Sequence, residues 1–287
     1  MTVLEAIQKS TDFLAKKGVD SPRLQSELLL AHVLKTKRLK LYLDFERKLT
    51  ESETAALREL IQRRGTREPL QHIVGSTSFC GLELKVNCNV LVPRPETELL
   101  AEQGWKFLNS LNHESTFLDF GTGSGCIAIA LCHFAKQSRG TAIDKSAEAL
   151  ATARENATKH AVDSRLQFIE SNSLTTLDSN FRFDLIISNP PYIPSSEIAT
   201  LQDEVRNFDP HSALDGGSDG LEFYRLLANE GPKHLAPSGK LMIEFGDGQQ
   251  DQIRSLFSSS SWNVEGILND LTDRPRILIA NRPSNRL

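Results

Sequence analysis

The sequence predicts an α/β protein in which helices cover both faces of a mostly parallel sheet, preceded by a small all-helical domain and a β-hairpin linker. Three observations support this fold class. Apolar residues recur at helical spacing from Val3 to about Arg67, short strand-like alternation follows between Gly75 and Val92, and from Pro95 onward apolar strand-like runs alternate with helical stretches. The predicted domain boundaries are 1–74, 75–93 and 94–287.

The composition is that of a globular protein with room for one large and one small domain. The 287 residues are 39% hydrophobic and 24% charged. No apolar run approaches the ~20 residues that are needed to cross a bilayer. The net charge of −4 gives no overall basic footprint for a phosphate backbone. We therefore expect neither a membrane nor a nucleic acid as a direct partner.

The N-terminal residues and the cysteines predict a cytoplasmic protein without a metal centre. Met1 to Ala6 show neither a basic region nor an uninterrupted apolar run of the kind that marks a secretory signal. The four cysteines never fall in a C-x-x-C pair and have no His spacing typical of zinc sites. We expect no metal ion and no disulfide.

Capping residues mark two helix starts within 1–74. Ser21 precedes Pro22, a residue favoured in the first helical turn, and is predicted to cap that helix. Thr50, with Glu53 three residues further on, has the spacing of a capping box. The segment that follows, between Gly75 and Val92, alternates apolar and polar residues around turn-forming Gly and Asn, as a hairpin does.

Six strand-like apolar runs follow the hairpin, separated by helical stretches. Such alternation is typical of βαβ units, whose ligands bind beyond the carboxyl ends of the strands. The runs are 117–120, 141–143, 166–169, 183–188, 240–244 and 276–280.

The first of these strands leads into a glycine-rich turn and then an apolar helix. Glycines allow a ligand to approach the backbone closely, and the helix start offers free N–H groups. The second strand ends at Asp144, whose carboxylate can accept both hydroxyls of a ribose. These features fit NAD as well as S-adenosylmethionine, and a turn without a ligand and an ordinary helix cap remain alternatives. The predicted nucleoside-binding residues are Gly121, Thr122, Gly123, Ser124, Gly125 and Asp144.

The fourth strand ends in Asn189-Pro190-Pro191-Tyr192, which favours S-adenosylmethionine. Two consecutive prolines fix two φ angles and remove two N–H donors, so the carbonyl groups of this loop are held as rigid acceptors. The side-chain oxygen of Asn189 and the main-chain oxygen of Pro190 can each accept one hydrogen of a planar –NH2 group. Tyr192 can stack on the flat substrate. We predict Asn189, Pro190 and Tyr192 as catalytic residues, with Pro191 also contacting the substrate; a simple X-Pro-Pro turn is the alternative.

Nearly the whole chain resembles the release-factor glutamine methyltransferases. The resemblance is carried by Arg67-Glu68-Pro69-Leu70-Gln71-His72-Ile73-Val74-Gly75, by Val92-Pro93-Arg94-Pro95-Glu96-Thr97-Glu98 and by the Asn-Pro-Pro-Tyr loop. It implies a seven-stranded, Rossmann-like methyltransferase domain over 94–287. It also implies transfer of a methyl group from S-adenosylmethionine to the N5 amide nitrogen of the glutamine in the Gly-Gly-Gln motif of class I peptide chain release factors, which the helical domain docks.

The resemblance adds three positions to the predicted cofactor site. It places Asn189 close to S-adenosylmethionine, in addition to its role toward the substrate. Many relatives have an Asp followed by an aromatic or apolar residue after the third strand, where this chain has Asn172 and Ser173. The Asn oxygen can still accept from the adenine amino group, but the charge and the stacking side chain are lost. We expect weaker cofactor binding from this change.

Other functions fit parts of the pattern. An adenine-N6 methyltransferase acting on DNA or RNA also uses Asn-Pro-Pro-Tyr on a planar amine, although the acidic net charge argues against it. A dinucleotide-dependent oxidoreductase is compatible with the glycine turn and Asp144, but it leaves Asn189 to Tyr192 unexplained. A non-catalytic binding module is a further alternative.

Overall fold

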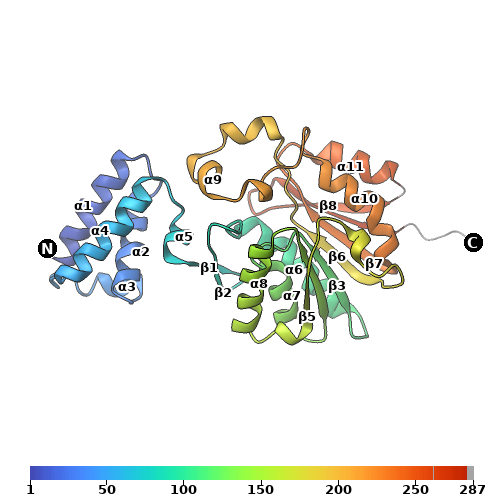
Figure 1. Ribbon diagram of the computed structural model, residues 1–287, viewed down its shortest axis with the longest axis horizontal. Helices are drawn as coiled ribbons and strands as arrows, with labels where there is room; N and C mark the ends of the chain where they lie inside the picture. Colours follow the sequence, from blue (N-terminus) through green and yellow to red (C-terminus); the bar gives the residue numbers. More distant parts are fainter. Residues whose placement is uncertain (261, 283–287) are drawn as a thin grey trace, which may run out of the picture. The chain divides into compact units, whose positions relative to one another are not determined.

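The structure is a computed structural model that describes residues 1–260 and 262–282 (Figure 1). The chain divides into two compact units. One comprises Met1–Ser76 together with Gln202–Phe208, and the other comprises Thr77–Leu201 and the chain from Asp209 onward. Residues 283–287 of the predicted 94–287 domain lie outside the described residues.

The first unit is all-helical, as the apolar spacing predicts. Its helices enclose one apolar core that includes Val3, Leu14 and Leu30. The helices are α1 (Val3–Lys16), α2 (Pro22–Val33), α3 (Arg38–Leu41), α4 (Glu51–Gly65), α5 (Leu70–Val74) and α9 (Asp203–Phe208).

The two predicted helix starts differ in how they are capped. Thr50 and Glu53 form the predicted capping box: Glu53 N donates to Thr50 Oγ1 at 3.1 Å and Thr50 N donates to Glu53 Oε2 at 2.9 Å. The prediction for Ser21 is wrong, because this residue has a left-handed backbone (φ 47°) and makes no side-chain cap. An N-cap side chain normally acts from an extended backbone, so Pro22 alone marks this start.

Helix α9 lies within 94–287 by sequence but packs with the N-terminal helices. The buried Arg64 of α4 donates to Glu204 Oε1 at 2.8 Å, and Arg67 donates to Glu204 Oε2 at 2.6 Å. Two guanidinium groups therefore hold one carboxylate of this short helix. The compact units and the predicted contiguous boundaries differ at this segment, since a pairing across some 140 residues leaves no local sequence pattern.

The second unit is built on a seven-stranded sheet with the order β5-β4-β3-β6-β7-β9-β8. The first five strands are parallel, and β9 is antiparallel to both β7 and β8, which confirms a mostly parallel sheet. The six predicted runs correspond to all strands except β8, whose Glu265 and Gly266 obscure the apolar pattern. The strands are β3 (Thr116–Phe120), β4 (Arg139–Asp144), β5 (Leu166–Glu170), β6 (Phe183–Ser188), β7 (Leu235–Glu244), β8 (Asn263–Asn269) and β9 (Pro275–Asn281).

Helices cover both faces of this sheet (Figure 1). One apolar core joins the sheet to α6 (Pro95–Ser110), α7 (Cys126–Phe134) and α8 (Ala147–Lys159). The other core joins it to α10 (Glu222–His234) and α11 (Gln250–Ser259). Among the described residues, no helix combines the length and apolar character of a membrane span.

The predicted hairpin consists of β1 (Ser76–Phe79) and β2 (Leu82–Lys85), and from Thr77 onward it belongs to the second unit. Phe79 and Leu84 belong to the core formed with α6 and α7. Asn156 of α8 accepts from Lys85 N at 2.7 Å and donates to Lys85 O at 2.9 Å, in the manner of a neighbouring strand. This bonding fixes the hairpin against the domain that carries the glycine turn.

Candidate active site

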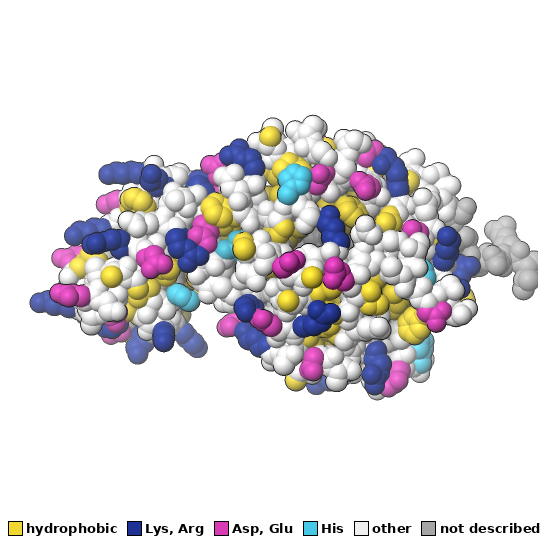
Figure 2. All heavy atoms as spheres, in the orientation of Figure 1, with side chains coloured by type: hydrophobic (Ala, Val, Ile, Leu, Met, Phe, Trp, Pro, Cys, Tyr) yellow, Lys and Arg dark blue, Asp and Glu magenta, His cyan; other side chains and the backbone are white. Residues whose placement is uncertain are grey.

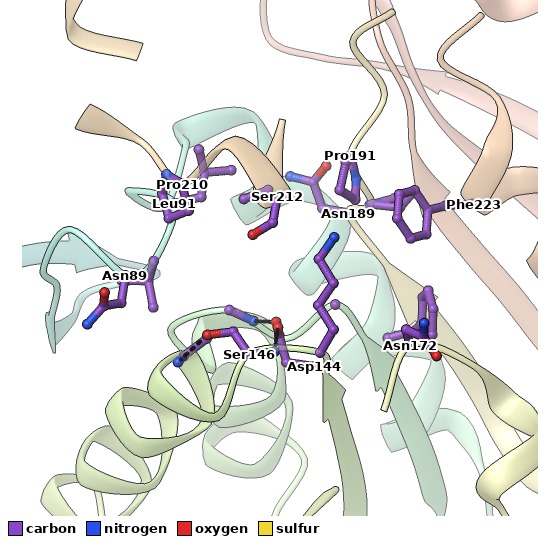
Figure 3. Close-up of a pocket in the computed structure, with 18 of the residues that line it drawn as sticks. Asn89, Leu91, Asp144, Ser146, Asn172, Asn189, Pro191, Pro210, Ser212 and Phe223 are labelled. Carbon is purple, nitrogen blue, oxygen red and sulfur yellow. Dashed lines mark hydrogen bonds between the residues drawn. The ribbon is translucent and has the colours of Figure 1, made fainter. Parts of the chain in front are cut away.

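A cleft opens beyond the carboxyl ends of β3, β4, β5 and β6 (Figure 3). The strand order reverses between the neighbouring strands β3 and β6, and ligands of such sheets bind at this position. Asp144 and Ser146 lie on one side of the cleft, and Asn189 and Pro191 lie on the other. The lining residues are Asn89, Val90, Leu91, Phe120, Gly121, Gly123, Asp144, Lys145, Ser146, Ala149, Ser171, Asn172, Asn189, Pro190, Pro191, Pro210, Ser212, Ala213 and Phe223.

The glycine turn contributes backbone atoms to this cleft, and its two side chains point elsewhere. Gly121 and Gly123 have positive φ angles and line the cleft, and a Cβ atom at either position would meet no atom within 4 Å. The side chains of Thr122 and Ser124 are buried, and neither they nor Gly125 line the cleft. The N–H groups of Gly121 and Thr122 both donate to Ile143 O, at 2.8 and 2.9 Å. The turn is thus fixed to β4 with its open side toward a ligand.

Gly125 has a packing role that Gly123 does not have. A Cβ at Gly125 would lie 3.0 Å from Ala153 Cβ and 3.0 Å from Ile129 Cδ1, between α7 and α8. We expect Gly125→Ala to lower the free energy of unfolding by about 3 kcal/mol, the sum of the left-handed backbone cost and overpacking. Gly123→Ala should cost only about 1–2 kcal/mol, from the backbone alone, but should weaken cofactor binding. Urea denaturation compares the two variants, and equal losses of stability would contradict this assignment.

Asp119 lies buried beneath the turn and holds it to α7. Its Oδ2 accepts from Thr122 Oγ1 at 2.7 Å and from Ala128 N at 3.1 Å. Burial raises the pKa of this carboxyl group to about 7, against the lowering effect of these hydrogen bonds, and the nearby Asp144 raises it further. Asp119 therefore stabilises the turn, and its side chain does not line the cleft.

Asp144 is oriented by the backbone on both sides of it. Gly123 N donates to its Oδ2 at 2.8 Å, and Ser146 N donates to its Oδ1 at 2.9 Å (Figure 3). Each carboxylate oxygen retains acceptor capacity, since an ionised carboxyl group has about four lone-pair sites. The fixed acid beside an open glycine turn fits the ribose of an adenosine-type ligand.

The two residues predicted after β5 are separated by the structure. Asn172 lines the cleft, whereas Ser173 does not. Ser173 Oγ accepts from Thr175 N at 3.1 Å and lies 3.2 Å from Glu230 Oε2, so it caps the short helix Leu174–Thr176. Its neighbour Ser171 lines the cleft instead.

An aromatic wall comes from a part of the chain that the sequence pattern does not connect with the cleft. Phe223, at the start of α10, lines the cleft and lies 6.3 Å from Phe120 between ring centroids. A second wall comes from Pro210, Ser212 and Ala213. Pro210, Ser212 and Ala213 lie in the long connection between β6 and α10, and Phe223 lies in α10 itself; no sequence motif singles them out.

Asn189 follows β6, and a hydrogen bond to α6 fixes its side chain. Its Nδ2 donates to Oγ1 of Thr97, a buried residue of α6, at 2.9 Å. This bond places the side-chain oxygen on the side away from Thr97. Pro190 and Pro191 line the cleft next to Asn189. The loop therefore presents acceptors at the mouth of the cleft opposite Asp144 (Figure 3).

Tyr192 does not line the cleft. It is packed beside Gly246, where a Cβ would lie 2.8 Å from Tyr192 Cδ2, and its main-chain oxygen accepts from Gln249 Nε2 at 3.0 Å. Burial raises the pKa of its hydroxyl. The predicted stacking of Tyr192 on a substrate stays a prediction.

The chain matches two sequence families. Residues 5–75 match the PrmC N-terminal domain, and residues 97–205 match the methyltransferase small domain. The chain is 42% identical over 261 residues to the release factor glutamine methyltransferase of Geobacter sulfurreducens, covering 91% of this chain and 90% of that protein. The corresponding protein of Caulobacter vibrioides is 37% identical, with 97% and 96% covered. This chain belongs to the release factor glutamine methyltransferase family.

Among solved structures, a methyltransferase from Pyrococcus furiosus shares the fold, with a TM-score of 0.53, 20% identity, and 77% of this chain and 98% of that chain covered.

The heptad Val92 to Glu98, one of the segments that carry the resemblance to this family, contacts three separate parts of the chain. Arg94 donates to Asp209 Oδ2 at 2.7 Å, Thr97 accepts from Asn189, and Glu98 Oε1 accepts from Cys80 N at 2.9 Å. The heptad thus joins the hairpin, the Asn-Pro-Pro-Tyr loop and the segment before Pro210.

Proposed function

We propose that this chain transfers a methyl group from S-adenosylmethionine to the N5 amide nitrogen of the glutamine in the Gly-Gly-Gln motif of class I peptide chain release factors. Two of its relatives are named release factor glutamine methyltransferase. The observation that carries the proposal is the hydrogen bond from Asn189 Nδ2 to Thr97, which leaves Oδ1 as the atom that Asn189 offers to an incoming amide. Two prolines behind it keep the acceptor loop rigid.

The cleft residues fit S-adenosylmethionine. Gly121 and Gly123 leave room against the backbone, Asp144 is oriented for the ribose, and Asn172 and Phe223 line the region available to the adenine. When bound, S-adenosylmethionine supplies an electrophilic methyl group on a sulfonium centre. No metal ion is required for this chemistry, because the sulfonium activates the methyl group by itself.

The chain's own contribution is to bind and orient a weak nucleophile. An amide nitrogen shares its lone pair with the adjacent carbonyl group, so it reacts slowly unless it is held in place. Asn189 Oδ1 and Pro190 O each accept one of its two hydrogens, which fixes the plane of the amide and increases electron density on nitrogen. Such orientation supplies much of the rate enhancement in group transfer. Methyl transfer would break the bond between the sulfonium sulfur and the methyl carbon as the bond to the amide nitrogen forms. It would leave S-adenosylhomocysteine, and the nitrogen would lose one proton to solvent.

The helical unit over 1–74 has a docking role in this proposal. Its compact core needs no contribution from the sheet to bury its apolar side chains. It presents basic and acidic side chains that can bind a folded release factor while the glutamine enters the cleft. Since release factors act on ribosomes, the proposed location is the cytoplasm.

An adenine-N6 methyltransferase acting on DNA or RNA is the second candidate, because its substrate is also a planar amine. On the face shown in Figure 2, Lys and Arg side chains are interspersed with Asp and Glu, whereas phosphate binding requires clustered positive charge. Methyl transfer from radiolabelled S-adenosylmethionine to a purified release factor, and to adenine-containing oligonucleotides, separates the two. We expect label in the protein; label in the oligonucleotides alone would overturn the proposal.

A further inference from the structure

Three polar side chains from three elements meet behind the acceptor loop. Asn189 follows β6, Thr97 lies in the first turn of α6, and Glu244 ends β7, the strand next to β6. Ser188 pairs with Ile243 in this parallel register, which brings the residues after them together. Thr97 is 2% exposed and Glu244 is 3% exposed, so solvent does not supply their hydrogen bonds.

The hydrogen-bond donors and acceptors of Thr97, Asn189 and Glu244 constrain one another. Thr97 Oγ1 accepts one hydrogen from Asn189 Nδ2 at 2.9 Å, and its own hydroxyl hydrogen needs an acceptor. Glu244 interacts with both Thr97 and Asn189. Its Oε2 atom has no hydrogen-bond partner among the described residues. An ionised Glu244 can only accept, so it requires Thr97 to donate toward it.

The surroundings of Glu244 decide its charge near neutral pH. Burial has the largest effect and raises the pKa of Glu244 to about 7. Hydrogen bonding from Thr97, the positive charge of Arg276 and hydrogen bonding from Asn189 lower this pKa, and the negative charge of Glu96 raises it. Tyr224 of α10 donates its hydroxyl to the main-chain oxygen of Glu244 at 3.0 Å. The half-buried Tyr192 also faces the carboxyl group. Glu244 is not among the residues that line the cleft, so it has no direct contact with a substrate there.

We infer that Thr97 and Glu244 are positioning residues that fix the orientation of the Asn189 side-chain amide. An Asn amide can rotate by half a turn with little change in shape, which exchanges its donor and acceptor ends. In the exchanged orientation, the –NH2 group of Asn189 would face the –NH2 group of the substrate. In this arrangement Glu244 is the acceptor for the hydroxyl hydrogen of Thr97. Thr97 can then only accept from Asn189, and Oδ1 stays toward the cleft. This role rests on the proposed function for its effect on turnover.

Thr97→Val is the direct test, because Val keeps the shape and removes the hydroxyl. We expect kcat to fall by up to about 100-fold, the loss associated with a misplaced reacting group, with an unchanged Kd for S-adenosylmethionine. Thr97→Ser should retain kcat within about threefold. Thr141→Val, at a buried threonine of β4, is the matched control and should leave kcat unchanged. Wild-type kcat in Thr97→Val, or equal losses in Thr97→Ser and Thr97→Val, would overturn the inference.

The pH profile of Glu244→Gln tests the other residue. In the unmodified protein kcat should fall as pH drops through about 7, because protonated Glu244 can donate to Thr97 and release the Asn189 amide. Glu244→Gln should lose this acidic limb. An identical profile in Glu244→Gln would show that another group titrates, and it would count against Glu244.

A spectroscopic readout separates this inference from the proposed function. Proton–nitrogen correlation spectra report the side-chain –NH2 signals of Asn189, assigned by their absence in Asn189→Asp. We expect these signals to shift with pH near 7 in the unmodified protein and to shift less in Thr97→Val, where only the direct interaction of Glu244 with Asn189 remains. This result would stand even if release factors proved not to be the substrate. Asn189 signals that are the same in both proteins would overturn the inference whatever the substrate is.

Discussion

Asn189→Ala is expected to lower kcat for methyl transfer about 100- to 1,000-fold, the loss found when one preorganised hydrogen-bonding group is removed from an active site. The substitution deletes Oδ1, one of the two proposed acceptors for the substrate amide, and leaves the glycine turn and Asp144 untouched. The Kd of S-adenosylmethionine should therefore change by less than about threefold. Single-turnover kinetics measure the first quantity, and calorimetry measures the second.

Asn189→Asp is the matched control, because it retains the shape and an acceptor oxygen. It removes the donor to Thr97, so we expect activity between that of the Ala variant and the unmodified protein. Parallel loss of cofactor affinity and of turnover in Asn189→Ala would instead make Asn189 a residue of the cofactor site alone.

Asp144→Ala is expected to raise the Kd of S-adenosylmethionine about 100-fold. Each hydrogen bond from a ribose hydroxyl to the carboxylate contributes roughly 1.5–3 kcal/mol, and about 1.4 kcal/mol corresponds to a tenfold change in Kd. The substitution also removes the acceptor of Gly123 N and Ser146 N, which loosens the turn itself. At saturating cofactor, kcat should recover most of its original value.

Two comparisons make this prediction specific. Asp163→Ala, at an exposed acid of the same domain, should leave the Kd unchanged. Urea denaturation of Asp144→Ala establishes that the variant is folded under the conditions of the calorimetry. An unaltered Kd in a folded Asp144→Ala protein would remove Asp144 from the cofactor site.

The parts of the fold that sequence alone predicts are those with a local pattern. The strands that lead into Gly121 and Asn189, and the capping box at Thr50, are set by neighbours in the chain. By contrast, Ser21 has the residue type of a cap but adopts a left-handed backbone. Strand β8 is missed because Glu265 and Gly266 interrupt its apolar pattern.

The candidate site likewise contains residues that the sequence predicts and residues that it does not. Gly121, Gly123, Asp144, Asn172 and Asn189 all line one cleft because parallel strands end at the same edge of the sheet. The residues that local reasoning could not supply come from distant segments, and they are Thr97, Glu244, Phe223 and the wall from Pro210 to Ala213. The positions of Thr97 and Phe223 depend on how helices α6 and α10 pack against the sheet, and that of Glu244 depends on the pairing of β7 with β6.

The partners of buried side chains also escaped sequence reasoning. Thr122, Ser124 and Ser173 have residue types that suit ligand binding, yet the structure buries the first two and uses the third as a cap. A hydroxyl group serves a ligand and a helix end equally well, so residue type alone does not decide between them.

The most direct test of the proposed activity is tandem mass spectrometry of a class I release factor incubated with this protein and S-adenosylmethionine. The proposal predicts that the peptide containing Gly-Gly-Gln gains the mass of one CH2 group, located on the glutamine side chain. In the same incubation time, Asn189→Ala should modify about 100- to 1,000-fold less of the peptide. An unmodified Gly-Gly-Gln peptide, obtained with a protein that still binds S-adenosylmethionine, would contradict the proposed substrate.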